Sequence, residues 1–197
     1  MRIVVSDFIS LDGVVQAPGG PDEDTDGGFG HGGWSMPYFD PDTMGPAVGE
    51  VMAETEALLF GRRTWQAMAA AWPERAGDPF ADRMNEIPKY VASRTLGERD
   101  LTWPNSTLLP AGDAIGAIRE LRDRDGEAVQ VMGSPSLAAQ LITHGLVDEY
   151  RLMIEPVLLG GGKRLFPADG AARPLELISA TVAATGVLIC TYRPADS

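Results

Sequence analysis

The sequence contains little from which a disulfide framework or a metal centre could be built. Its 197 residues include one cysteine and two histidines. Cys190 lies in the apolar run GVLICTY, which contains no histidine or cation that would activate the thiol. A small buried hydrophobic residue is therefore the expected role for this cysteine. We expect no disulfide and no bound metal.

Basic residues are also scarce. The chain has 16 lysines and arginines against 28 aspartates and glutamates, which gives a formal net charge of −12 at pH 7. Binding to nucleic acid or to an anionic membrane needs a basic face that neutralises phosphates, and this composition does not supply one. Any site for an anion must therefore be local.

Long hydrophobic runs are missing too. The longest apolar stretches are the length of a strand, and Asp7 interrupts the first of them, MRIVVSDFISLDG, before it could act as the core of a signal peptide. We therefore expect a cytoplasmic protein. Its length fits one compact domain over residues 1–197.

Residue patterns predict an alternation of strands and helices. Helices are expected at 44–56, 62–72, 114–122 and 134–145, and a long loop rich in Gly, Pro and Asp at 11–42. Strands are expected at 2–10, 57–60, 88–93, 106–110, 128–132, 147–159, 175–184 and 186–194. This order predicts an α/β fold with a mixed, mainly parallel sheet flanked by helices, ending in an antiparallel hairpin.

Three predicted strands each end in residues that suit an anion: Gly61-Arg62-Arg63-Thr64, Ser93-Arg94-Thr95 and Gly133-Ser134-Pro135-Ser136. Ligands of open α/β sheets bind outside the carboxyl ends of the strands, where helix N-termini present free N–H groups. Each cluster taken alone is explained equally well by helix caps or solvent-exposed arginines. Together they favour a nucleotide with several phosphates. Arginines suit a ribose 2′-phosphate, so NADPH is favoured over NADH.

Two other glycine-rich stretches carry weaker signals. GGFGHGG matches the spacing G-x-G-x-x-G, but it follows an acidic loop and no strand precedes it. GGGKRLF, at 160–166, lacks the spacing of a phosphate-binding loop. We interpret it as a tight bend that lets the backbone approach the active site or a partner subunit.

Four segments together carry a resemblance to a known superfamily. They are SLDG, LLFGRRTW, YVASRT and VMGSPSLAAQLITHGLVDEYRLMIEPVLLGGGKRLF, in that order. The chain resembles the dihydrofolate reductase-like superfamily, and within it the branch that contains the reductase domain of the bifunctional riboflavin-biosynthesis deaminase-reductase. The resemblance implies extended binding of NADPH and hydride transfer to a pterin or to a pyrimidine, as in 5-amino-6-(5-phosphoribosylamino)uracil reductases. It also implies a homodimer formed through the late strands.

The resemblance assigns the three clusters to parts of the cofactor. Gly61, Arg62 and Thr64 would bind phosphates, with Arg63 beside them. Ser93 and Arg94, followed by Thr95, would lie at the 2′-phosphate, and residues 133–137, ending at Leu137, would hold the pyrophosphate. Dihydrofolate reductases have two glycines where this chain has Gly133-Ser134, and a serine is acceptable there if its φ is ordinary. Pro135 has no N–H, so Ser134, Ser136 and Leu137 would donate instead.

The catalytic end is predicted from fewer residues. Hydride transfer needs an acid or an ordered water to supply a proton. The resemblance of GGWSMPYFDPD to the loop before the first helix of dihydrofolate reductases makes Asp40 the first candidate and Asp42 the second. Asp12 of SLDG is the other candidate, and Trp34 would stack on a flat substrate. Helix capping or a turn explains the aspartates equally well.

Two alternatives to a reductase stay open. The first is a non-catalytic nucleotide- or ligand-binding protein on the same fold. The second is a purely structural domain in which the three clusters only cap helices, and it predicts no affinity for nucleotides.

Overall fold

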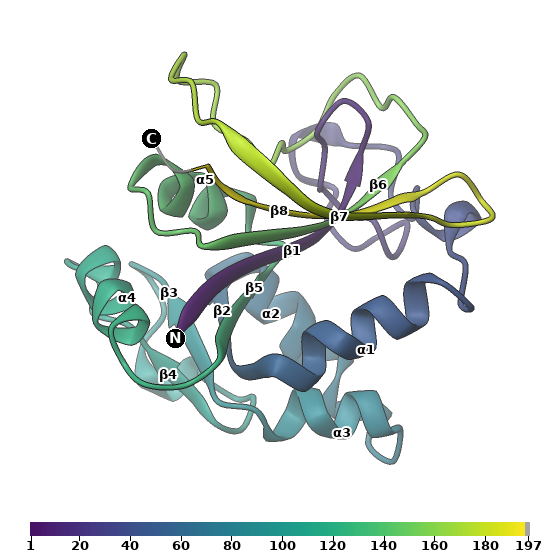
Figure 1. Ribbon diagram of the computed structural model, residues 1–197. Helices are drawn as coiled ribbons and strands as arrows, with labels where there is room; N and C mark the ends of the chain where they lie inside the picture. Colours follow the sequence, from purple (N-terminus) through teal and green to yellow (C-terminus); the bar gives the residue numbers. More distant parts are fainter. Residues whose placement is uncertain (196–197) are drawn as a thin grey trace.

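The computed structural model describes residues 1–195, which form one eight-stranded sheet with five α-helices (Figure 1). The strands are β1 (Arg2–Ser10), β2 (Thr55–Gly61), β3 (Lys89–Ala92), β4 (Ser106–Leu108), β5 (Ala128–Met132), β6 (Glu149–Glu155), β7 (Leu175–Val182) and β8 (Leu188–Pro194). The helices are α1 (Met44–Glu54), α2 (Arg62–Ala71), α3 (Pro79–Glu86), α4 (Ala114–Arg122) and α5 (Pro135–Thr143).

The strand order is β4-β3-β2-β5-β1-β6-β8-β7. All pairs from β4 to β6 are parallel, and β8 pairs antiparallel with both β6 and β7. The predicted fold class, a mixed and mainly parallel sheet with a C-terminal antiparallel hairpin, is therefore confirmed. One helix was not predicted from the sequence. This is α3, which Asp78 caps by accepting hydrogen bonds from the backbone N–H groups of Phe80 and Ala81.

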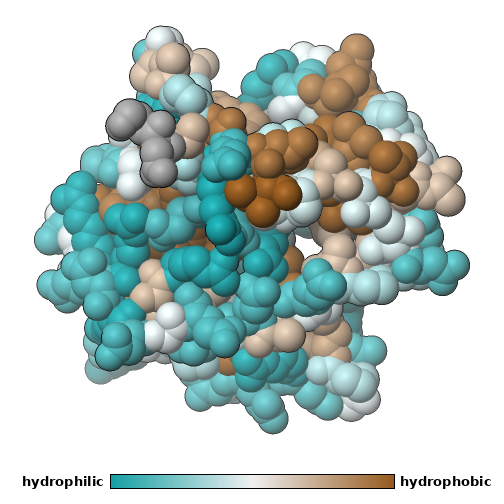
Figure 2. All heavy atoms as spheres, viewed as in Figure 1, coloured by the Kyte–Doolittle hydropathy of each residue, from teal (hydrophilic) through white to brown (hydrophobic). Residues whose placement is uncertain are grey.

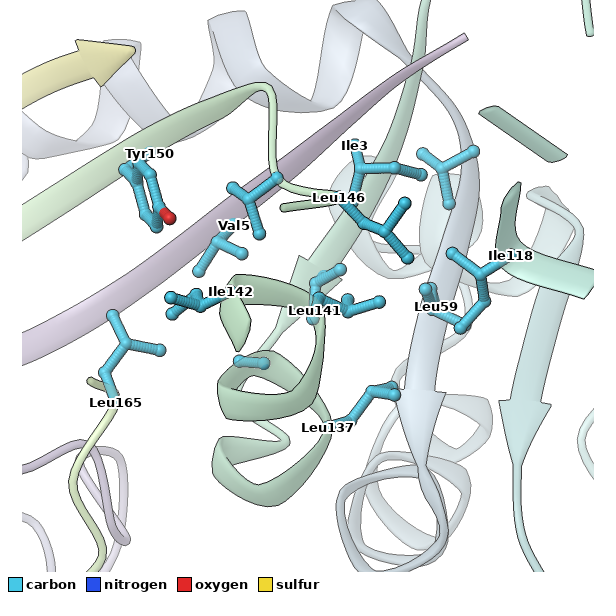
Figure 3. Close-up of a cluster of buried hydrophobic side chains, with 14 of the residues drawn as sticks. Ile3, Val5, Leu59, Ile118, Leu137, Leu141, Ile142, Leu146, Tyr150 and Leu165 are labelled. Carbon is cyan, nitrogen blue, oxygen red and sulfur yellow. The ribbon is translucent and has the colours of Figure 1, made fainter. Parts of the chain in front are cut away.

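Helices cover both faces of the parallel part of the sheet. Leu58 and Leu59 of β2 show the alternation, because their side chains belong to two different buried clusters. On one face, α4 and α5 pack over β1, β2 and β5, and Figure 3 shows Leu141 and Ile142 of α5 beside Val5 of β1. On the other face, side chains of α1, α2 and α3 form a second cluster with β2 and β3. These clusters fix the positions at which the helices begin.

The hairpin end of the sheet is different. Every residue of β7 is exposed, including Leu177, Ile178 and Val182. Figure 2 shows hydrophobic side chains gathered on the surface where Figure 1 places β7. As the last strand of the sheet, β7 also has an unpaired edge.

Among residues 1–195, we find no helix that is both long and apolar enough to cross a membrane.

Candidate functional site

The three strand-end clusters lie at the same edge of the sheet. They follow β3, β2 and β5, which are consecutive neighbours and run parallel. The carboxyl ends of these strands therefore lie side by side, and the clusters follow one another along the edge. Sequence alone could place a cluster after each strand but could not show that the three strands are neighbours.

The N-termini of α2 and α5 meet at the centre of this edge. The backbone N–H of Gly61 donates to Ser134 Oγ at 2.9 Å, and the N–H of Ser134 donates to Thr64 Oγ1 at 3.0 Å. Neither helix is capped by the side chain of its own N-cap residue. Two helix ends with partial positive charge are thus held together, which is an arrangement suited to a phosphate or another anion.

The turn that starts α5 has a left-handed backbone. Gly133 has a φ of 55°, and Ser134 has a φ of 57° and a ψ of 48°. The condition under which a serine would be easily accepted here, an ordinary φ, is therefore not met. A non-glycine residue in this region costs roughly 1–2 kcal/mol, and the two hydrogen bonds of Ser134 to the start of α2 hold it there. A Cβ at Gly133 would lie 3.2 Å from Thr64 Cγ2, so the close approach of the two helices also favours glycine.

Several N–H groups of this turn already have partners within the protein. Gly133 donates to Asp7 Oδ1 at 2.6 Å, Ser134 to Thr64, and Leu137 to the carbonyl of Ser134 at 2.8 Å. Pro135, as expected, is at the first helical position and has no N–H. Of the three predicted pyrophosphate donors, Ser136 is the one whose N–H has no acceptor within residues 1–195.

The third cluster forms a compact turn after β3. Ser93 Oγ accepts hydrogen bonds from the backbone N–H groups of Thr95 at 3.1 Å and Leu96 at 3.0 Å. Ser93 is therefore buried, while Arg94 and Thr95 are exposed. Arg94 therefore belongs to the outermost of the three clusters, and its exposed side chain is accessible to a ligand.

Asp12 connects the loop after β1 to the bend after β6. Its carboxylate accepts hydrogen bonds from Ser10 Oγ at 2.7 Å and from the N–H groups of Leu159 and Gly160 at 3.1 and 2.9 Å. These bonds, chiefly the one from Ser10, lower the pKa of Asp12 to about 2. Asp12 is thus ionised at neutral pH and acts as a hydrogen-bond acceptor.

Asp40 has a similar connecting role at the other end of the long loop. Its carboxylate accepts from Thr43 Oγ1 at 2.9 Å and from the N–H of Ala184, in the turn between β7 and β8, at 3.1 Å. The pKa of Asp40 is lowered, mainly by the bond from Thr43. Asp42 is exposed. Asp40 therefore ties the start of α1 to the hairpin and, like Asp12, is ionised at neutral pH.

Trp34 belongs to the long loop and is buried. Its side chain is 7% exposed, and its indole Nε1 donates to the carbonyl of Gln16 at 2.7 Å. Burial of the indole with a satisfied N–H holds the ring in one orientation. The next residue, Ser35, is also buried.

Two acidic residues that the sequence analysis did not select contact the residues described above. Asp7 accepts a hydrogen bond from Gly133, and Glu155 accepts one from Ser35. β1 pairs with β5 only as far as Ser6–Met132, so the remainder of β1 extends beyond the end of β5. Asp7 is the first residue of that extension. Its Oδ1 accepts the Gly133 N–H, its Oδ2 is buried and has no partner in the described part of the chain, and burial raises its pKa well above the usual value.

Glu155 is the second of these residues. It ends β6 opposite Ser10 of β1, at the same edge of the sheet as the clusters. Its Oε1 accepts from Ser35 Oγ at 2.7 Å, Oε2 is buried with no hydrogen-bond partner among residues 1–195, and burial raises its pKa to about 7. The signal that could have identified both residues is an acid next to apolar residues of a strand, Asp7 before Phe8-Ile9 and Glu155 after Met153-Ile154, because a buried carboxyl group is costly without partners.

Arg62 and Arg63, at the start of α2, have different surroundings. Arg62 Nη1 donates to Gln66 Oε1, one helical turn away, at 3.3 Å. Arg63 forms an ion pair with Asp26 of the long loop. Arg62 therefore hydrogen-bonds within its own helix, whereas Arg63 contacts the long loop.

Comparison with protein-family models matches residues 2–189 to the family described as the RibD C-terminal domain. A curated relative, the uncharacterized protein YyaP of Bacillus subtilis (strain 168), is 27% identical over 196 residues, which cover 97% of this chain and 94% of YyaP. Among solved structures, a putative riboflavin biosynthesis protein from Shewanella sp. PV-4 has a TM-score of 0.75 at 20% identity and covers 100% of both chains.

A dihydrofolate reductase from Enterococcus faecalis, solved with NADP(H), has a TM-score of 0.61 at 13% identity and covers 99% of this chain and 97% of its own. At these identities the two solved structures show a shared fold.

Proposed function

The chain belongs to the RibD C-terminal domain family, and on that premise we propose that it is an NADPH-dependent reductase of a small planar heterocycle. The substrate class is a pterin or a pyrimidine of the riboflavin-precursor type. The observation that supports a nucleotide cofactor most directly is the row of three clusters along one sheet edge, with two helix N-termini hydrogen-bonded to each other at its centre.

The residues at this edge fit the chemistry of NADPH. Its pyrophosphate needs N–H donors and cations, and Arg62 and Thr64 at the start of α2, with Ser136 of α5, supply them. The exposed Arg94 beside Ser93 would bind the ribose 2′-phosphate that distinguishes NADPH from NADH. When bound, the nicotinamide supplies the hydride. In a chain with a net charge of −12, these local donors are what allows an anion to bind.

The proton for the reduced substrate needs a group that is protonated at neutral pH. Asp12 and Asp40 both have lowered pKa values, so their carboxylates suit the binding of substrate N–H groups or of an ordered water. Glu155, with a pKa of about 7, exchanges a proton readily near neutral pH. We therefore assign proton supply to Glu155, with Asp12 and Asp40 orienting the substrate and Trp34 limiting its pocket.

The alternative hypothesis on the same fold is a protein that binds a nucleotide without catalysing a reaction. It shares the cofactor site and differs only in lacking a reaction. Glu155 favours the enzyme, because buried carboxyl groups with perturbed pKa values cluster at catalytic sites, and its Oε2 has no partner within residues 1–195.

The decisive experiment is a fluorescence titration with NADPH and with NADH, using the wild type, Arg62→Met and Arg94→Met. Hydrogen bonds to a charged group are worth about 1.5–3 kcal/mol, so each loss should weaken NADPH binding about tenfold or more. Arg94→Met should also abolish the preference for NADPH, whereas Arg62→Met should weaken both cofactors. Arg119→Met, in the last turn of α4, removes an equal charge from an exposed position and is the control.

Three outcomes separate the hypotheses. Binding of NADPH that depends on Arg62 and Arg94, together with turnover in a screen of pterins, flavins and aminouracils, supports the reductase. The same binding without turnover supports the non-catalytic rival. Absence of NADPH and NADH binding in a folded wild-type protein refutes the proposed function.

We also propose a homodimer that forms through β7. An edge strand with an unpaired backbone and exposed Leu177, Ile178 and Val182 is suited to association with a second copy.

A further inference from the structure

The acidic tip of the long loop, residues 22–26, lies against two cations, Arg63 of the candidate site and Lys163. The Asp26 carboxylate contacts Arg63 and also lies 3.0 Å from Lys163 Nζ, and Asp24 Oδ2 lies 2.6 Å from the same Nζ. Arg63 belongs to the first turn of α2, and Lys163 to the glycine-rich bend after β6. A single carboxylate thus bridges cations from two segments that are far apart in the sequence.

Gln16 positions both sides of this contact. It is 3% exposed, and its Nε2 donates to the carbonyl oxygens of Asp24 and Asp26 at 3.1 and 3.0 Å. Its Oε1 accepts the backbone N–H of Lys163 at 3.0 Å. One buried amide therefore fixes the backbone of the loop tip and the backbone of Lys163 relative to each other. The fold thus brings Asp24 and Asp26 close to Lys163.

A surface hollow opens beside the contact. Its lining includes Gln16, Asp26, Phe29, Leu159, Gly162 and Lys163. Gly162 must be a glycine here, because a Cβ would lie 2.8 Å from the Phe29 ring and its φ is 115°. The hollow gives a ligand access to Lys163 and to the Asp26 carboxylate from the side of the bend.

The contact is suited to exchange. The side chains of Arg63, Asp26 and Lys163 are 57%, 46% and 27% exposed, and exposed ion pairs contribute little to stability. A phosphate group carries up to two charges and three acceptor oxygens, so it binds a guanidinium and an ammonium more strongly than one carboxylate does. Arg63 also lies in the first turn of α2, where the helix dipole favours an anion.

We propose that Arg63 and Lys163 form a binding site for the phosphate group of a ligand, and that Asp26 is an internal anion which that phosphate displaces. The inference deepens the proposed function and rests on it. The phosphate can belong to the cofactor or to a phosphorylated heterocyclic substrate, and the chemistry at the two cations is the same. Displacement requires only the Asp26 side chain to rotate away from Arg63 and Lys163, because Gln16 holds the backbone of the acidic tip at 22–26 through the carbonyl oxygens of Asp24 and Asp26.

The test compares Asp26→Asn with Asp22→Asn by titration with NADPH and, separately, with ribose 5-phosphate. Asp22 is exposed on the same tip, and its carboxylate forms no hydrogen bond or ion pair within residues 1–195, so its variant controls for the change in net charge. Relative to this control, Asp26→Asn should tighten binding about two- to fivefold, which corresponds to the loss of one competing exposed ion pair. Tightening of NADPH identifies the cofactor as the source of the phosphate, and tightening of ribose 5-phosphate alone identifies the substrate.

A second variant tests the cation. Lys163→Met keeps the apolar stem and should weaken the same probe about threefold or more, with a smaller dependence on salt. Equal affinities for Asp26→Asn and Asp22→Asn, or an unchanged affinity in Lys163→Met, would overturn the inference while leaving the NADPH site intact. A wild type that binds neither probe overturns the proposed function and the inference together.

Discussion

Replacement of Glu155 by glutamine should change how the stability of the protein depends on pH. The Glu155 side chain is fully buried, Oε1 accepts the Ser35 hydroxyl, and Oε2 has no partner within residues 1–195. Burial raises the pKa of Glu155 from 4.5 to about 7 in the folded protein. The folded state therefore binds more protons than the unfolded state between these pH values, and the wild type should lose stability as pH rises through this window.

The magnitude follows from the two pKa values. At 1.36 kcal/mol per pKa unit, the change from 4.5 to about 7 corresponds to about 3 kcal/mol. This contribution is fully present below pH 4.5 and is lost by about pH 7. Glutamine has a similar shape, is neutral at every pH, and its carbonyl oxygen can accept the Ser35 hydroxyl. The stability of the variant relative to the wild type should therefore rise by about 3 kcal/mol between pH 4.5 and pH 8.

Urea unfolding, followed by tryptophan fluorescence at several pH values from 4.5 to 8, measures this difference. Asp7 also has a raised pKa, but its contribution is the same in both proteins and cancels. Glu120→Gln on the exposed side of α4 is the control and should follow the wild type at every pH. A difference between Glu155→Gln and the wild type that stays constant with pH would refute the argument that Glu155 titrates as a buried carboxyl group.

Two further predictions concern the turn before α5 and the exposed edge strand. Ser134→Ala should lose about 1–2 kcal/mol of unfolding free energy, because it leaves the Gly61 N–H without its acceptor while the φ of 57° stays strained, as in the wild type. Ser134→Gly loses the same acceptor but relieves the strain, so it should be about 1 kcal/mol more stable than Ser134→Ala in urea unfolding; equal stabilities would contradict this account. Ile178→Lys on β7 should shift a dimer to monomers in sedimentation equilibrium, whereas Thr181→Ser on the same strand should not, and a dimer unaffected by Ile178→Lys would place the interface elsewhere.

Local patterns predicted most of the elements. Short apolar runs predicted β1 and β5 and helical spacing predicted α4, and the structure contains all three, with Asp113 capping α4 through its bond to the N–H of Gly116. These elements were predictable because their signals lie within a few residues of one another. The helix α3 was missed although Asp78 and Pro79 mark its start, since its surroundings read as a polar connection.

The candidate site was also predicted in part from the sequence and in part only from the structure. Sequence alone determined that three strands end in groups suited to an anion, because strand ends, glycines and arginines are properties of short segments. The order β3-β2-β5, which brings these ends together, depends on pairings between distant segments and was settled by the tertiary structure.

The remaining features depend on burial and on contacts across the chain. The left-handed Ser134 is stabilised by the start of α2, and Asp26 reaches Arg63 only because Gln16 holds the loop. Glu155 holds a proton near neutral pH because the fold removes it from water. Sequence fixes which groups a segment carries, whereas the environment that sets their charge and their partners exists only once distant segments have packed together.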